Sequence, residues 1–134
     1  MYLLDTVTFS EFFKRSRHSG FVEWISDKTS TALYVSTVTI GEVERGIEAQ
    51  RRRDPAFAAA LIAWLDSSIA LYGDRVLPVT TDIARRWGRL SAVIGNSDAD
   101  IMIAATALEH GLIVATRNVR HFLPTGASVE NPFA

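Results

Sequence analysis

Three acidic side chains stand where an apolar strand, or the loop after it, meets the start of a helix. They are Asp5, Glu42 and Asp100. Carboxylates brought together would repel one another and lose hydration, and a divalent cation removes both penalties. Because Mg²⁺ prefers oxygen ligands, this placement favours an acidic metal site at the functional end of a parallel sheet.

Helix capping is the alternative explanation for two of these acids. The patterns Thr39-x-x-Glu42 and Ser97-x-x-Asp100 both fit the capping box or its Asp variant. An acid at such a position satisfies backbone N–H groups and the positive end of the helix dipole. Asp5 is harder to explain in this way, because it follows a strand and Thr6 or Thr8 is available as the cap. Capping and metal binding both stay open for Glu42 and Asp100.

Several other kinds of site are excluded by residues that the chain lacks. It has no cysteine, which removes thiol catalysis, disulfides and cysteine-ligated metals. Its three histidines are far apart in sequence, and it has no P-loop, no dinucleotide-binding glycine pattern and no G-x-S-x-G nucleophile elbow. With 14 basic and 15 acidic residues, the net charge is −1. Any contact with nucleic acid must therefore come from a local basic patch.

The elements that must position the acids alternate between strand and helix along 134 residues, a length typical of one domain. We predict a single α/β domain over residues 1–134, with a short parallel sheet of four to five strands flanked by helices. Strands are expected at 2–5, 32–35, 76–79, 112–115 and 128–130, and helices at 8–15, 20–27, 39–53, 56–71, 81–94 and 97–110.

No apolar run is expected to reach the roughly 20 residues of a membrane span. The N-terminus also carries Asp5 inside any possible signal core, with no cleavage signature after it. We therefore expect a cytoplasmic protein without membrane contact.

Four segments with chemical or structural signals follow one another along the chain. They are Leu3-Leu4-Asp5-Thr6 with Ser10-Glu11, Ser36 to Val43 with Gly46, Asp100 to Ala107 with His110-Gly111-Leu112, and Ala115-Thr116-Arg117-Asn118 with Phe122. In this order they resemble the motifs of PIN-domain proteins, and most of all the VapC/FitB-type toxins of bacterial toxin–antitoxin pairs. The resemblance covers essentially the whole chain. The resemblance implies a PIN-like fold.

The same resemblance implies a metal-dependent endoribonuclease acting as the toxin of a type II pair. Asp5, Glu42 and Asp100 would hold Mg²⁺ or Mn²⁺, which activates a water against an RNA phosphodiester. The fourth acidic position of the family falls on Asn118. The hydroxyls of Thr6 and Thr116 would support these ligands.

Two residues depart from the family pattern. Val7 stands where many relatives have Asn, and Asn118 is neutral where others have an acid. We therefore expect one well-held metal ion and a second that is weak or absent. Asp98 is expected to cap a helix or lie on the surface, pointing away from Asp100, and His121 to be an ordinary surface residue.

The resemblance also implies partners: a VapB-type antitoxin, a second copy of the chain in a homodimer, and promoter DNA bound only through the antitoxin. The apolar helical pair at 44–71 is the expected dimer or antitoxin surface. RNA contacts are expected from Arg117, Lys14 and Arg85. Val7 and Asn118 keep open an alternative, a catalytically weak or silent PIN-like module that binds RNA or a protein partner.

Overall fold

A computed structural model describes all 134 residues. The fold is a single α/β domain built on a five-stranded, wholly parallel sheet in the order β3-β2-β1-β4-β5. The strands are β1 (Tyr2–Leu4), β2 (Leu33–Ser36), β3 (Val76–Leu77), β4 (Ile113–Ala115) and β5 (Val129–Glu130). The predicted α/β class and strand number are confirmed.

The first strand occupies the centre of the sheet. Tyr2 pairs with Leu33 on β2 and with Ile113 on β4, so both neighbours run parallel to β1 in the same register. Leu3 and Leu4 are fully buried. A strand buried on both faces needs a continuous apolar sequence, and this is why its first polar residue, Asp5, comes at the carboxyl end of the strand.

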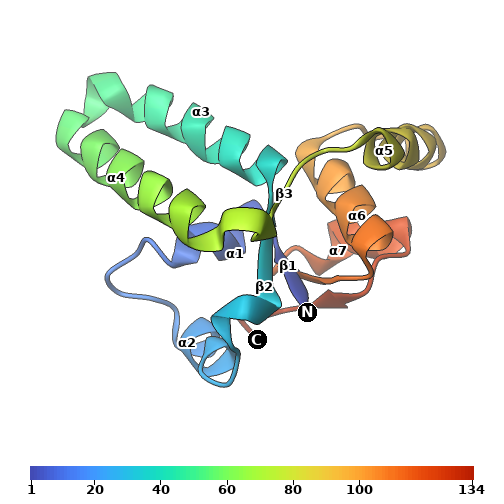
Figure 1. Ribbon diagram of the computed structural model, residues 1–134, viewed down its shortest axis with the longest axis horizontal. Coiled ribbons are helices and arrows are strands. Elements are labelled where there is room, and N and C mark those ends of the chain that lie inside the picture. Colours follow the sequence, from blue (N-terminus) through green and yellow to red (C-terminus); the bar gives the residue numbers. More distant parts are fainter.

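Seven α-helices connect and cover the strands (Figure 1). They are α1 (Thr6–Glu11), α2 (Ser19–Ile25), α3 (Thr37–Arg53), α4 (Pro55–Tyr72), α5 (Thr81–Ile94), α6 (Ala99–His110) and α7 (Val119–Phe122). The helix α7 was not predicted, and three of the others, α1, α3 and α6, start two residues away from the predicted position. Asp5, Ser36 and Asp98 are their N-caps, each with a side-chain oxygen that accepts a backbone N–H of the first turn. The polar residue nearest each strand or loop end therefore starts the helix.

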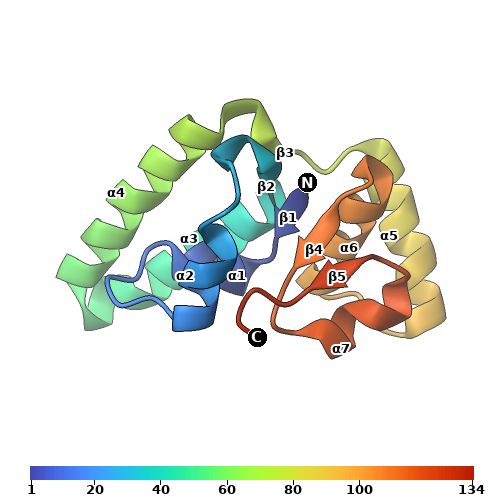
Figure 2. The same ribbon diagram turned by 90° about the horizontal axis from the view of Figure 1, so that it is seen from below.

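Helices cover both faces of the sheet, as Figures 1 and 2 show, with α3 and α4 on one side and α5 and α6 on the other. Each side has its own apolar core. One cluster joins Leu3 and Val114 to Ile103 on α6, and the other joins Leu4 and Val35 to residues of α3 and α4. The carboxyl ends of the central strands lie between these two layers, where Asp5 and Thr116 follow β1 and β4.

The helix α4 leaves much of its apolar surface exposed. By length and composition, the segment Pro55–Arg75 is sufficient to cross a membrane, so the expectation that no run reaches that size was wrong. One such helix is weak evidence for a span, because α4 also packs in the domain through Ala58 and Leu65. Phe57, Ile69 and Leu71 remain exposed.

Candidate metal centre

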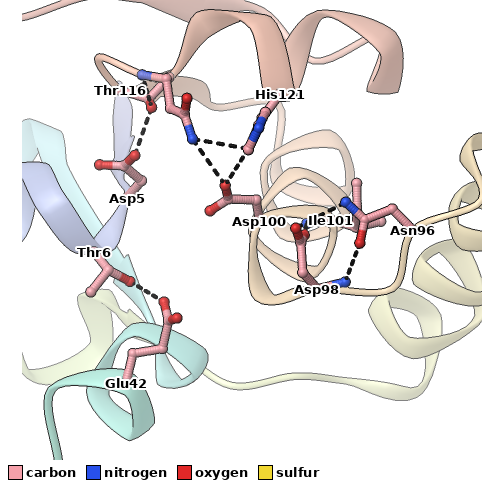
Figure 3. Close-up of polar contacts among 10 residues, drawn as sticks. Asp5, Thr6, Glu42, Asn96, Asp98, Asp100, Ile101, Thr116 and His121 are labelled. Carbon is pink, nitrogen blue, oxygen red and sulfur yellow. Dashed lines mark hydrogen bonds and ion pairs between the residues drawn. The ribbon is translucent and has the colours of Figure 1, made fainter. Parts of the chain in front are cut away.

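The three predicted acids line one cavity of about 360 Å³ at the carboxyl ends of the strands. The other lining residues are Thr6, Val7, Arg117 and Asn118. Figure 3 shows the carboxylates of Asp5, Glu42 and Asp100 around this space, each carried by a different element. The structure thus brings together residues separated by up to 113 positions in the sequence.

Asp5 is the most buried of the three acids and is only 3% exposed. Its Oδ1 accepts the Thr8 backbone N–H at 2.9 Å, and its Oδ2 accepts the Thr116 hydroxyl at 2.6 Å. The N-cap of α1 is therefore Asp5 and neither of the available threonines, so the argument against a capping role for Asp5 was wrong. Because β1 runs directly into α1, the single residue between them takes the capping position while its carboxylate still lines the cavity.

Glu42 projects from the second turn of α3, so it caps nothing, and the capping explanation is excluded for it. The Thr6 hydroxyl donates a hydrogen bond to Glu42 Oε1, and Thr6 Oγ1 also lies 3.2 Å from Thr39 Oγ1. The other carboxylate oxygen, Oε2, lies 3.6 Å from Arg45 Nη2. Thr6 thereby links the first turn of α1 to α3 across the cavity.

Asp100 lies in the first turn of α6, and the cap of that helix is Asp98. Its Oδ2 is 3.3 Å from His121 Nδ1 and 3.5 Å from Asn118 Nδ2. Burial raises the pKa of Asp100 above its ordinary value, and the negative charges of Asp98 and Asp5 add to this effect. The contact with His121 acts in the opposite direction.

His121 was missed from the sequence, and Asp98 was misplaced. The ligand atoms of Asp98, Asp100 and His121 lie within 4.8 Å of one another, so Asp98 does not point away from Asp100 and His121 is not an ordinary surface residue. The capping role expected for Asp98 is confirmed by its bond to the Ile101 N–H. His121 stands three residues after Asn118, and that helical spacing was the available signal.

The donor set suits a hard divalent cation, because it consists of carboxylate oxygens with hydroxyls and a side-chain amide beside them. The carboxylates of Asp5, Glu42 and Asp100 are spread more widely than the Asp98–Asp100–His121 group, which is the set of ligand atoms within 4.8 Å of one another. These three carboxylates therefore do not form one compact group of ligand atoms. Mg²⁺ usually keeps several of its waters and takes one or two protein carboxylates, so the wider spacing still fits.

The three basic residues predicted to contact RNA lie in different places. Arg117 lines the acidic cavity. Lys14 lines a larger adjoining cavity of about 930 Å³ and forms an ion pair of 2.9 Å with the buried carboxylate of Glu11. Arg85 lies on the outer helix α5 and lines neither cavity.

The comparison with known proteins agrees with this architecture. The family model described as PIN domain matches residues 2–123. The chain belongs to the PIN domain family. It is 33% identical to the VapC ribonuclease Y4jK of Sinorhizobium fredii, over 99% of this chain and 98% of that protein.

Solved structures place this PIN domain close to toxin–antitoxin proteins. The crystal structure of FitAcB from Neisseria gonorrhoeae matches with a TM-score of 0.86 and 29% identity, over 99% of both chains. The structure of FitAB bound to an IR36 DNA fragment matches with a TM-score of 0.86 and 28% identity, over 100% of this chain and 96% of that chain. The predicted resemblance to VapC/FitB-type proteins is confirmed.

Proposed function

We propose that this PIN domain is a metal-dependent endoribonuclease and the toxin of a type II toxin–antitoxin pair. The observation that carries the proposal is the convergence of Asp5, Glu42 and Asp100 on one cavity at the carboxyl edge of the sheet. Similarity to a protein named VapC ribonuclease supports RNA as the substrate. No side-chain nucleophile is needed, which agrees with the absence of cysteine.

In the proposed mechanism, Asp5, Glu42 and Asp100 would hold Mg²⁺ or Mn²⁺. A divalent cation lowers the pKa of a water and stabilises negative charge on the phosphoryl oxygens. The protein's part is to hold these carboxylates in a fixed orientation. Thr116 and the Thr8 N–H fix Asp5, and the Thr6 hydroxyl fixes Glu42. Such supporting hydrogen bonds are worth about 10- to 100-fold in metal affinity.

Asn118 takes the fourth position of this set. Its Nδ2 lies 2.9 Å from His121 Nδ1 and 3.5 Å from Asp100 Oδ2. A neutral amide at this corner supplies one negative charge fewer than a carboxylate, so we infer one tightly held ion and a weaker or absent second ion. Two tight Mn²⁺ sites per chain in a calorimetric titration would contradict this inference.

We infer a VapB-type antitoxin as partner, with promoter DNA bound through it, because the similar structures include FitAB bound to DNA. The cavity of about 930 Å³ lies beside Glu42 and is lined by the apolar side chains of Phe13, Phe57 and Leu61. Its size and its apolar lining suit a segment of the antitoxin. The exposed face of α4 is the corresponding candidate for a homodimer contact. We place the protein in the cytoplasm, with the domain extending over residues 1–134.

The deciding experiment is RNA cleavage by the purified chain, free of antitoxin, with Mg²⁺ or Mn²⁺. Cleavage should be abolished by EDTA and by Asp5→Asn. The matched control is Asp54→Asn, because Asp54 also caps a helix through a bond to a backbone N–H but is exposed and lies outside the acidic cavity. Asp54→Asn should leave cleavage unchanged. Metal binding without cleavage of any RNA would favour the silent module.

A further inference from the structure

Arg117 is the one basic side chain that lines the acidic cavity, and it forms an unusual contact. Its guanidinium lies 4.0 Å from the centroid of the Phe133 ring. Throughout the chain, no ion pair within 4.0 Å and no hydrogen bond joins the guanidinium to a carboxylate. An arginine beside acids normally forms a bidentate pair with one of them. The contact with the ring has taken the place of that pairing.

Phe133 is firmly seated although it is the next-to-last residue of the sequence. Its side chain is 8% exposed, stacks on Phe21 at 5.7 Å and meets the His18 ring edge-on at 5.5 Å. Gly20 allows this approach, since a Cβ there would lie 2.9 Å from the Phe133 carbonyl oxygen. Figure 2 shows the end of the chain lying beside α2. The ring is therefore a fixed surface and not a mobile tail.

A flat aromatic surface changes what the guanidinium can do. The guanidinium lies over the ring, and no hydrogen bond or ion pair to a carboxylate uses its N–H groups, so these groups are available to an acceptor. The nearby Glu11 adds attraction without occupying those donors. Glu11 is buried, and its two oxygens already accept from Lys14 and from the His18 N–H. The arrangement holds a positive charge at the cavity and keeps it off the carboxylates.

We propose that Phe133 is a positioning residue, which holds Arg117 at the rim of the acidic cavity so that its free N–H groups contact a backbone phosphate of the bound RNA. The inference rests on the proposed function, because it specifies how that site recognises its substrate. It makes the end of the chain part of the RNA-binding apparatus, through a contact between residues 16 positions apart.

The stacking itself is testable in the metal-free protein by NMR. Protons of the Arg117 side chain above the ring should be shifted upfield by the ring current of Phe133. Phe133→Tyr should retain the shift, and Phe133→Leu should abolish it while keeping an apolar side chain in the core. Arg117 shifts that are the same in Phe133→Leu and the wild type would overturn the proposal.

A double-mutant cycle tests the effect on RNA binding. Affinity is measured by the fluorescence anisotropy of a labelled single-stranded RNA in EDTA, where no cleavage is expected. Phe133→Leu and Arg117→Ala should each weaken binding, by about threefold to tenfold. The double variant should bind no more weakly than Arg117→Ala alone, because Phe133 acts through Arg117. Phe133→Tyr should restore wild-type affinity.

The control is Arg17→Ala, since Arg17 also lies over an aromatic ring, that of Phe12 at 5.8 Å, but lines a different cavity. It should leave binding almost unchanged. Additive losses from Phe133→Leu and Arg117→Ala, or no binding of RNA by the wild type, would overturn the inference. The binding cycle requires no catalysis, so a wild type that binds RNA but cleaves none would count against the nuclease and leave the inference supported.

Discussion

Replacing Thr116 by valine tests how much the Thr116 hydroxyl contributes to holding Asp5. Thr116 is fully buried, and its hydroxyl donates to Asp5 Oδ2 at 2.6 Å and accepts the Asn118 N–H at 2.8 Å. Valine keeps the shape and removes both bonds. Losing a hydrogen bond to a buried charge costs roughly 1.5–3 kcal/mol. We therefore expect Thr116→Val to lower the free energy of unfolding by about 2–3 kcal/mol in EDTA.

A buried threonine that also accepts the backbone N–H two residues later provides the control. The Thr125 hydroxyl donates to the Phe122 carbonyl and accepts the Ala127 N–H, but it does not line the acidic cavity and bonds only neutral groups. Thr125→Val should cost about 1 kcal/mol. Urea denaturation followed by tryptophan fluorescence measures both variants.

Adding Mn²⁺ separates the two variants further. A carboxylate that has lost its supporting bond should bind the ion about tenfold more weakly. With saturating Mn²⁺ the stability gap between wild type and Thr116→Val should therefore widen by about 1.4 kcal/mol, while the gap for Thr125→Val stays constant. Two results would refute the reasoning. One is an equal loss of unfolding free energy in both variants in EDTA, and the other is a difference between wild type and Thr116→Val that does not change when Mn²⁺ is added.

Three further predictions concern neighbouring residues. The pKa of Glu11 is held below its ordinary value, against the effect of burial, by the His18 N–H and Lys14, so its stabilisation is present above the unfolded pKa and is lost as pH falls through the folded pKa. Glu11→Gln should cost about 1–2 kcal/mol in urea denaturation at neutral pH and much less near pH 3; an equal cost at both pH values would contradict this. His121→Ala should move the acid limit of Mn²⁺ binding to higher pH, because His121 opposes the raised pKa of Asp100; calorimetry between about pH 4 and 6 measures it, and an unchanged limit would count against the contact. Gly20→Ala should lower the free energy of unfolding by about 1–3 kcal/mol in the same urea assay, because its Cβ meets the Phe133 backbone; an unchanged value would show that the tail yields freely.

The sequence predicted the sheet and the meeting of the three acids because both depend on local patterns. Buried parallel strands read as apolar runs, so the polar residue that ends a run marks the edge where ligands bind. Asp5 was found in this way, and Glu42 and Asp100 were found by their place at predicted helix starts. Their common cavity agrees with the expectation that the three acids meet. Their roles as ligands stay a prediction.

What the sequence did not show depends on geometry between distant segments. His121 reaches Asp100 from a helix of one turn, 21 residues later, and its spacing of three from Asn118 is too short a pattern to identify such an element by itself. Asp5 caps α1 because the strand runs into the helix without a loop, and helix starts are rarely predicted to a single residue. The contact of Arg117 with Phe133 depends on the path of the chain after β5, which carries no sequence signal.

The central place of β1 in the sheet determines when the acidic site can form during synthesis of the chain. The first strand of the sheet pairs with β4, and Thr116 contacts Asp5 across 111 residues of sequence. Contacts of such long range form late and slow the folding of a chain. A nascent chain therefore carries Asp5 and Glu42 long before the cavity exists, and the acidic centre is complete only after β4, Arg117 and Asn118 have been synthesised.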